Sequence, residues 1–277
     1  MSEDFLAAMA RSSRERVARA RQLHPQQELQ ARARDLPPAP SFTPSNDGFD
    51  LIAEVKLRSP AAGQLKAGGE DIPARVLAYA EAGAAAISVL TEPSRFDGAL
   101  SHLTQAASGL AGRIPVMRKD FLVDAYQVYE ARVAGAGGVL IILRMLARAE
   151  LEALIEAASQ LGLFALLEAF DDTDLRLAAA LVREYAARTS LLVGVNCRDL
   201  VTLKVVPGRL EALAPLLPPT VPRVAESGVA TGGDAARLAA AGYDVALVGS
   251  ALMQAGDPLA LAAALLAAGR AAAHAGV

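Results

Sequence analysis

The stretch Val116-Met117-Arg118-Lys119-Asp120-Phe121 is a short apolar run that ends in charged residues and then breaks toward the next helical stretch. Lys119 stands at its tip. A lysine at the end of a buried strand loses hydration, and desolvation disfavours its charged form. We therefore expect Lys119 to serve as a proton donor, or as a partner for a carbonyl group, near neutral pH.

Three other segments repeat this pattern of an apolar run that delivers polar side chains at its end. They are residues 51–56 with Glu54 and Lys56, residues 164–168 with Glu168, and residues 191–196 with Asn196. Residues that alternate along a strand share a face, so Glu54 and Lys56 are expected to point the same way. The chain thus reads as a series of strands that bring polar groups to one place.

From Gly48 onward, apolar runs alternate with stretches rich in Ala and Leu. Near-continuous apolar strands between amphipathic helices are typical of a parallel sheet covered by helices. The pattern predicts an α/β fold, a single (β/α)8 TIM barrel over residues 48–277. Its strands are expected at 51–56, 85–90, 115–118, 138–142, 163–168, 191–195, 222–226 and 245–248, and its helices at 73–82, 98–110, 124–135, 147–161, 171–187, 208–215, 231–241 and 257–273.

Residues 1–47 differ in composition from the barrel. From Asp4 to Arg34 they are rich in the helix formers Ala, Arg, Glu and Gln, and a linker with several prolines follows. We expect an N-terminal helical extension in which the arginines from Arg11 to Arg21 form a solvated face. The alternative is that the extension caps the barrel and lends a basic residue to an anionic ligand.

Composition excludes several classes of protein. The chain has 277 residues, of which 53% are hydrophobic, enough to bury one large core, and its net charge of −3 gives no case for binding nucleic acid or an acidic membrane. A single cysteine and a start without a signal-peptide pattern indicate a cytoplasmic protein. Apolar runs such as 139–143 are too short to span a bilayer. No large exposed apolar stripe stands out, so a monomer is expected.

The carboxyl ends of barrel strands are where chemistry gathers, and several ends here carry polar groups. The first strand is followed by Ser59, the third ends at Lys119, the sixth leads to Arg198, and the seventh ends at Glu226. An ion-pair network that serves only stability is the alternative for these groups. Each buried polar group costs desolvation, however, and folding does not require all of them at one end.

Small residues follow the last two strands and suit a phosphate group. Ser227 and Gly228 come after the seventh strand, and Gly249 and Ser250 after the eighth. Free backbone N–H groups near helix starts bind phosphate dianions, and barrels frequently place such a site after strands seven and eight. Lys56 is expected to add charge from across the mouth. The alternative, that both glycines only serve turns, is weakened because the two pairs occur together.

Some sites are excluded by what the sequence lacks. His24, His102 and His274 lie away from every expected strand end, which argues against a Ser-His-Asp triad or a histidine zinc site, and no metal site is expected. Cys197 has no histidine near it and is expected to be a packed small residue. No glycine-rich dinucleotide fingerprint follows the first strand, so no cofactor is expected. Acid–base chemistry by lysine and glutamate on a phosphorylated small molecule remains.

Six motifs, in order along the chain, resemble the indole-3-glycerol phosphate synthase family of tryptophan biosynthesis. The resemblance runs from about residue 50 to the end, and the helical extension fits that family too. It implies a carboxy-lyase that needs no cofactor and closes the indole ring of 1-(2-carboxyphenylamino)-1-deoxyribulose 5-phosphate with loss of CO2 and water. The motifs are Ile52–Pro60, Ser88–Pro93, Arg118–Leu122, Tyr126–Arg132, Gly194–Leu200 and Ala225–Val229.

The resemblance also implies roles for individual residues. Lys119 matches the general acid that acts on the substrate carbonyl, and Glu168 matches the glutamate of the later proton transfers. We expect desolvation and a nearby Lys56 or Arg198 to lower the pKa of Lys119. Catalytic positions are then Lys119, Glu168, Lys56, Glu54 and Asn196, and substrate-binding positions are Ser59, Phe121, Arg198, Glu226, Ser227, Gly228, Gly249 and Ser250.

The chain departs from the family pattern in a few loop positions. Phe170 stands where many relatives have a histidine, Ala61 and Ala62 replace a more usual polar pair, and residues 203–208 look irregular. Residues 63–69, with Lys66, are the expected lid over the substrate.

Two other readings of the sequence stay open. One is a sister phosphate-binding barrel such as phosphoribosylanthranilate isomerase. That family uses a cysteine and an aspartate, and Cys197 is badly placed to be this cysteine. The other is a degenerate barrel that acts as a scaffold or regulatory subunit. Association of the expected monomer with other pathway enzymes is compatible with either function. The presence of both Lys119 and Glu168 argues against that second reading.

Overall fold

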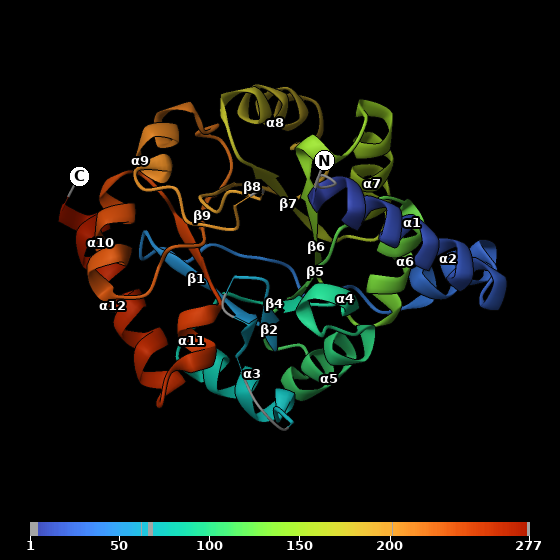
Figure 1. The fold of residues 1–277 in the computed structure, drawn as a ribbon, viewed down its shortest axis with the longest axis horizontal. Helices are drawn as coiled ribbons and strands as arrows, with labels where there is room; N and C mark the ends of the chain where they lie inside the picture. The colour runs from blue at the N-terminus through green and yellow to red at the C-terminus, as the bar shows by residue number, and fades with distance from the viewer. Residues whose placement is uncertain (1–4, 62, 66–68, 201, 276–277) are drawn as a thin grey trace.

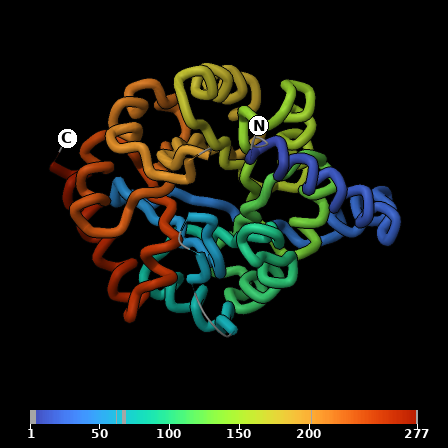
Figure 2. The backbone as a smooth tube through the Cα atoms, viewed as in Figure 1, coloured from blue at the N-terminus to red at the C-terminus, as the bar shows by residue number. Residues whose placement is uncertain are grey.

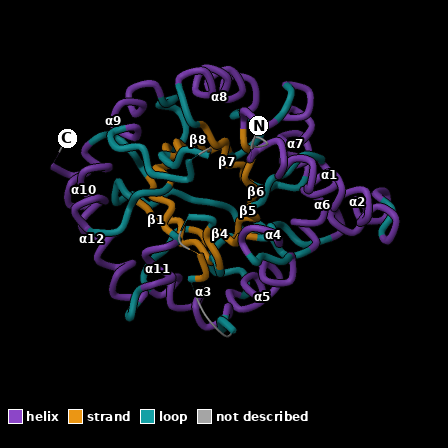
Figure 3. The backbone as a smooth tube through the Cα atoms, in the orientation of Figure 1, coloured by secondary structure: helices purple, strands orange, loops and turns teal. Residues whose placement is uncertain are grey.

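The computed structural model describes residues 5–61, 63–65, 69–200 and 202–275. Within this part of the chain a closed barrel of parallel strands is formed, in which neighbours in sequence are neighbours in the sheet and the last strand pairs with the first. Figure 3 shows the strands at the centre with helices around them. The strands are β1 (Asp50–Val55), β4 (Ala86–Leu90), β5 (Val116–Lys119), β6 (Gly138–Ile142), β7 (Phe164–Ala169), β8 (Leu191–Asn196), β9 (Arg223–Glu226) and β10 (Val245–Val248).

The helices that follow these strands form the outer layer (Figure 1). Strand boundaries differ from the predicted ones by no more than one residue, and helix boundaries by no more than two, so the predicted barrel is confirmed. The outer helices are α3 (Ile72–Glu81), α5 (Leu100–Leu110), α6 (Ala125–Val133), α7 (Arg148–Gln160), α8 (Asp172–Tyr185), α9 (Arg209–Leu213), α10 (Gly232–Ala240) and α12 (Pro258–Ala275).

Several short elements in the loops were not predicted, because segments this short carry no hydrophobic period of their own. A two-stranded hairpin and two helices lie beside the carboxyl ends of the barrel strands, and two 3-10 turns follow β6 and α9. These elements are β2 (Arg58–Ser59), β3 (Gly63–Gln64), α4 (Pro93–Phe96), α11 (Ser250–Gln254), η1 (Leu143–Met145) and η2 (Ala214–Leu216).

The core has two parts because strand side chains alternate between the lumen and the helices. Met117, Leu140 and Leu166 belong to the cluster that fills the lumen. Val116, Val139 and Leu167, one residue away, belong to the larger cluster between the strands and the helices. Lys119 therefore shares the lumen side of β5 with Met117.

The extension forms two helices, α1 (Phe5–Leu23) and α2 (Gln26–Asp35), where one helical stretch was expected. The break falls at Pro25, whose ring cannot continue a helix interior. Figure 2 shows both helices, in blue, on one flank of the barrel, and the chain then running back to β1. On this return path Phe42 joins the lumen cluster and packs against Phe164, with ring centroids 5.6 Å apart. The predicted linker thus helps to close the amino end of the barrel.

One of the described helices, α12, is long and apolar enough to cross a membrane by length and composition alone. This helix lies along α10 and also contacts α3 and β1. Its residues Ala262, Leu265 and Leu266 are buried in the outer cluster. The apolar character of α12 is therefore partly used in packing on the barrel.

Gly138 leaves room for an aromatic ring of the lumen. A Cβ placed there would lie 2.3 Å from the nearest atom of the Phe164 ring, and that ring is 1% exposed and held by Phe42. We expect Gly138→Ala to lower the free energy of unfolding by about 1–3 kcal/mol, the usual cost of overpacking. Urea denaturation is the measurement, with Gly256→Ala as the control because nothing lies within 4 Å of a Cβ at Gly256. Equal stability of the two variants would contradict this account of the lumen.

Candidate active site

A cavity of about 1000 Å³, counted out to its open mouth, lies at the carboxyl ends of the barrel strands. Every residue that the sequence analysis assigned to the site lines this cavity, although their roles stay predictions. They lie on the carboxyl ends of β1, β5, β7, β8 and β9 or in the loops that follow these strands and β10. They are Glu54, Lys56, Ser59, Lys119, Phe121, Glu168, Asn196, Arg198, Glu226, Ser227, Gly228, Gly249 and Ser250.

Lys119 lies between two carboxylates at the centre of the cavity. Its Nζ is 2.7 Å from Oε2 of Glu226 and 3.4 Å from Oε1 of Glu168. Asn196 donates a hydrogen bond from Nδ2 to the same Oε1 of Glu168, at 2.9 Å. Glu168 and Glu226 are 2% and 1% exposed. These contacts hold the ammonium group in place and leave one of its three N–H donors for a ligand.

The pKa of Lys119 differs from the expectation drawn from the sequence. Burial lowers it, but the carboxylates of Glu226, Glu168 and Glu54 outweigh burial and raise the pKa of Lys119 above its usual value. The prediction of a lowered pKa was therefore wrong. It counted Lys56 as a neighbouring charge, whereas the Nζ of Lys56 pairs with Oε1 of Glu54 at 2.8 Å.

The pKa of Glu226 is also raised, which for an acid favours the uncharged form. Burial is the largest cause, and together with the nearby Glu168 it raises the pKa of Glu226 to about 8 against the attraction of Lys119. Its Oε1 is buried without a hydrogen-bond partner among the described residues. Three carboxylates and two lysines share this cavity, so Glu226 is protonated more easily than an exposed glutamate, although its pairing with Lys119 favours the charged form.

Two glycines make room for the carboxylates of the site. A Cβ at Gly194 would lie 2.4 Å from Oε1 of Glu226, and a Cβ at Gly249 would lie 2.3 Å from Oε1 of Glu54. Real Cβ atoms do not approach another atom so closely, and both carboxylates are held by lysines. Gly249, assigned to phosphate binding from the sequence, therefore also gives Glu54 the space in which it pairs with Lys56.

The loop after β9 has a backbone suited to an anion. Ser227 and Gly228 both have positive φ, at 68° and 74°. Successive residues in such conformations can turn their N–H groups toward one concave surface. The thiol of Cys197 donates to the carbonyl oxygen of Ser227 at 3.2 Å, and Cys197 is 2% exposed. Burial raises the pKa of this thiol, in keeping with the predicted packed residue.

The side of the cavity opposite the loop after β9 is apolar. Of its residues, the sequence analysis had identified only Phe121. The Phe121 ring packs edge-on against Phe5 of α1, with centroids 5.8 Å apart, and lies 6.1 Å from the ring of Phe96. Leu140 and Ile142 could have been found, because they alternate at the end of β6 on its lumen side. Phe5 and Phe96 carry no such signal, because only tertiary packing brings α1 and α4 to the mouth. Leu200 completes this side.

The loop after β8, which looked irregular in the sequence, is folded back on itself. Arg198 and Val205 form an antiparallel bridge, and Arg198 donates from Nη1 to the carbonyl oxygen of Leu203 at 2.7 Å. The backbone N–H of Arg198 donates to Oδ1 of Asn196 at 2.9 Å, which fixes that amide beside Glu168. Of the expected lid, Lys66 lies outside the described residues, as does Ala62 near the hairpin.

No group of three or more His, Cys, Asp or Glu side chains arranged to hold a metal ion occurs in the described part of the chain. The carboxylates at the cavity are instead engaged by lysines and an amide. The arrangement therefore offers a charged donor, two carboxylates that flank it, an anion-binding loop on one side and an aromatic wall on the other.

Comparison with known proteins places this cavity in a family. Residues 6–265 match the family model described as indole-3-glycerol phosphate synthase. Proteins of that name from Opitutus terrae and Rhodopirellula baltica are 42% and 40% identical to this chain. The first alignment covers 82% of this chain and 85% of the relative, and the second covers 92% and 96%.

Solved structures with low sequence identity share the fold. The 3-hexulose-6-phosphate synthase from Salmonella typhimurium aligns with a TM-score of 0.63 at 16% identity, over 81% of this chain and all of that protein. A thiamine phosphate pyrophosphorylase from Pyrococcus furiosus aligns with a TM-score of 0.56 at 16% identity, over 82% of this chain and 98% of that one. At such identities the likeness concerns the barrel.

The raised pKa of Glu226 predicts a pH-dependent stability. Its value of about 8 in the folded protein exceeds the ordinary 4.5, so folding favours the protonated acid. That stabilisation is complete below pH 4.5 and is lost as the pH rises through 8. We expect wild-type protein to lose on the order of 1–3 kcal/mol of unfolding free energy, relative to Glu226→Gln, between pH 5 and pH 8. Urea denaturation across this range measures the difference, and Glu28→Gln at an exposed position of α2 is the control. Parallel pH curves for wild type and Glu226→Gln would refute the shift.

Proposed function

This chain belongs to the indole-3-glycerol phosphate synthase family, and from that membership and the cavity geometry we propose how its residues carry out the reaction. The enzyme closes the indole ring of 1-(2-carboxyphenylamino)-1-deoxyribulose 5-phosphate and releases CO2 and water. The observation that carries the assignment of roles is the position of Lys119, held by two carboxylates between an anion-binding loop and an aromatic wall.

The two sides of the cavity orient the substrate. Its phosphate binds the loops after β9 and β10, at Ser227, Gly228, Gly249 and Ser250, with Lys56 adding charge from β1. Its aryl ring packs on the apolar side, in contact with Phe121 and its neighbours. The ketone of the linear sugar then lies between the two ends, where Lys119 donates into the cavity. The aryl carboxylate faces Ser59, Asn196 and Arg198 in this orientation.

Ring closure is the step assigned to Lys119. The ring carbon that carries the carboxylate forms a bond to the ketone carbon, and the ketone oxygen receives a proton from the ammonium group. A donor with a raised pKa still fits this step, because an alkoxide that develops on the former ketone is a stronger base than a lysine amine. The ammonium also stabilises the developing negative charge in a cavity of low dielectric.

The next steps restore aromaticity and remove water. The bond to the carboxylate breaks and CO2 leaves, so that its electron pair returns to the ring. The hydroxyl formed from the ketone takes a proton from the Lys56 ammonium and departs as water, and the neighbouring carbon loses a proton. Solvent then returns a proton to Lys56, and Lys119 regains its own from the adjacent carboxylate. Glu168 lies 3.4 Å from the Nζ of Lys119 and takes this proton, while Asn196 holds its carboxylate in position. Glu226 and Glu54 hold the lysines Lys119 and Lys56 by their ion pairs.

The competing readings fit the structure less well. An isomerase that uses a cysteine and an aspartate would need a thiol in the cavity, but Cys197, the only cysteine of the sequence, faces the loop carbonyl of Ser227. A scaffold would have no use for a buried lysine between two buried carboxylates. The monomeric state, the cytoplasmic location and the absence of nucleic-acid partners stay predictions.

Lys119→Met is the direct test of the proposed acid. We expect it to reduce turnover by at least about a hundredfold, the range lost with a general acid, while binding of the substrate phosphate persists. Indole fluorescence follows turnover of 1-(2-carboxyphenylamino)-1-deoxyribulose 5-phosphate, and a titration with the product follows binding. Unchanged turnover in Lys119→Met would remove the lysine from the mechanism, and wild-type protein that binds without turnover would favour the scaffold reading.

Gly194→Ala tests whether the position of the Glu226 carboxylate matters for catalysis. The new methyl group would occupy the place of Oε1 of Glu226 and push the carboxylate away from Lys119. We expect turnover to fall by about tenfold or more, since small misplacements of a catalytic group carry large rate costs. Gly233→Ala in α10 is the control, because its Cβ would meet only the Thr231 hydroxyl at 3.6 Å. Full activity in Gly194→Ala would show that Lys119 does not depend on this partner.

A further inference from the structure

The residues on either side of Lys119 are buried and charged. Arg118 does not line the cavity, and Asp120 lies at its edge with its carboxylate bound to groups outside the lumen. Because side chains alternate along β5, Arg118 faces the helices while Lys119 faces the lumen. Asp120, the first residue after β5, turns its carboxylate toward α1. Arg118 is 3% exposed and Asp120 is 2% exposed. A strand that ends in two buried charges needs partners for both, and these partners decide how the strand end is held.

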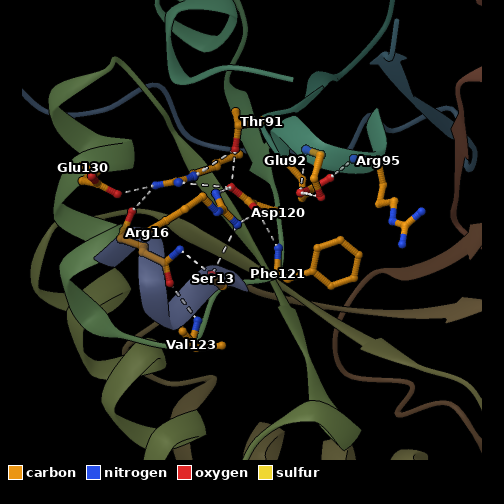
Figure 4. A network of polar contacts seen from close by, with 12 residues as sticks. Ser13, Arg16, Thr91, Glu92, Arg95, Asp120, Phe121, Val123 and Glu130 are labelled. Carbon is orange, nitrogen blue, oxygen red and sulfur yellow. Dashed lines mark hydrogen bonds and ion pairs between the residues drawn. The ribbon is translucent and has the colours of Figure 1, made fainter. Parts of the chain in front are cut away.

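Asp120 is the centre of this network (Figure 4). Arg16 of α1 donates two hydrogen bonds to its carboxylate, from Nη1 to Oδ2 at 2.9 Å and from Nη2 to Oδ1 at 2.8 Å. The hydroxyl of Thr91 donates to Oδ2 at 2.7 Å, and Nη2 of Arg118 does so at 3.1 Å. The backbone N–H of Phe121 donates to Oδ1 at 2.8 Å. Despite burial, Arg16, Arg118 and Thr91 hold the pKa of Asp120 at about 2.

Arg118 extends the network to α6. Its Nε donates to the hydroxyl of Thr91 at 3.1 Å, and its Nη1 donates to the carbonyl oxygen of Gln127 at 2.9 Å and pairs with Glu130 at 3.1 Å. The amide of Gln127 in turn donates to the hydroxyl of Ser13 at 2.9 Å. Arg118, through Gln127, and Asp120, directly through Arg16, are thus tied to α1, a helix that lies outside the eight β/α units.

Arg16 differs from the other arginines of α1. The prediction of a solvated face holds for Arg14 and Arg21, whose side chains are 54% and 41% exposed and whose partners Glu150 and Asp124 lie at the surface. It is wrong for Arg16, whose side chain is 19% exposed and whose partner Asp120 is fully buried. Exposed pairs contribute little to stability, whereas loss of one partner of a buried pair leaves an uncompensated charge.

We propose that Arg16 and Asp120 are positioning residues, which fix the end of β5 and so the directions from which Lys119 and Phe121 enter the cavity. The proposal rests on the proposed role of Lys119. Asp120 follows Lys119 directly and binds the N–H of Phe121, so a shift of its carboxylate moves the backbone that carries both side chains. The same helix supplies Phe5 against Phe121. Docking of α1 and assembly of the catalytic centre therefore depend on each other.

Three variants test this role: Arg16→Met, which removes the charge and both hydrogen bonds, Arg16→Lys, which keeps the charge but not the two-pronged contact, and Arg21→Met as the control. Arg21 is matched because it also links α1 to the barrel by an ion pair of 2.8 Å, but at the exposed Asp124. Steady-state kinetics with the carboxyphenylamino-deoxyribulose phosphate and urea denaturation are measured for each variant under conditions in which it is folded.

We expect kcat of Arg16→Met to fall by about tenfold or more while KM changes by less than about threefold, because Lys119 is misplaced whereas the phosphate contacts after β9 and β10 remain. Arg16→Lys should recover part of kcat, and Arg21→Met should stay within about twofold of wild type. Partial unfolding would also lower the apparent kcat without changing KM, so kcat is referred to the folded fraction that urea denaturation gives. Recovery of this corrected kcat in Arg16→Lys then separates a positioning role from a loss of stability. If Arg16→Met does not fold, Arg16→Lys against Arg21→Met carries the same comparison.

The outcomes separate this proposal from the proposed function. Wild-type protein that fails to turn over the compound would overturn the function itself. Active wild type, together with an Arg16→Met variant whose kcat equals that of Arg21→Met, would overturn the positioning role alone. An equal fall of kcat in Arg16→Met and Arg21→Met would also overturn it, since any loosening of α1 would then suffice.

Discussion

The ion pair between Lys119 and Glu226, 2.7 Å long and closed off from water on the barrel side, is the contact on which the site depends. It joins β5 to β9, strands that are not neighbours in the sheet. Only a closed barrel brings their carboxyl ends into one mouth, where side chains from opposite strands meet. The fold and the site are therefore linked by geometry, because a shift of register in either strand would turn these charges toward the helices.

A cavity that collects three carboxylates must satisfy both space and charge. Space comes from Gly194 and Gly249, whose missing Cβ atoms leave room for Glu226 and Glu54. Charge is balanced by Lys119 and Lys56, and burial together with the neighbouring charge of Glu168 raises the pKa of Glu226. Two buried carboxylate oxygens, Glu54 Oε2 and Glu226 Oε1, have no hydrogen-bond partner among the described residues. Buried polar atoms without partners cost stability, and such a cost is typical of a functional site.

Much of this arrangement could be predicted from the sequence, for a physical reason. Strand ends are marked by an apolar run that stops at a polar residue, and a barrel converts that order along the chain into proximity, which is why Glu168, Asn196 and Glu226 were found. Phe5 and Phe96 were missed because their place at the mouth comes from the docking of α1 and α4, which leaves no local pattern. The direction of the pKa shift at Lys119 also could not be predicted from the sequence, because it depends on which charged side chains point toward the lysine. Arg198 turns to Leu203 and Lys56 to Glu54, so neither opposes the carboxylates around Lys119.

The extension shows how a segment outside a barrel can become part of its chemistry. The eight β/α units supply Lys119 and the groups that face it, but the backbone that follows Lys119 is held by Asp120, and Asp120 is held from outside by Arg16. Burial makes this contact selective, because a carboxylate that is shielded from water must keep a fixed partner, while the exposed pairs of α1 can exchange theirs with solvent. A helix that closes one side of the cavity with Phe5 is thereby anchored at the residue next to the catalytic lysine. The wall of the cavity and the position of the proton donor are set by the same element.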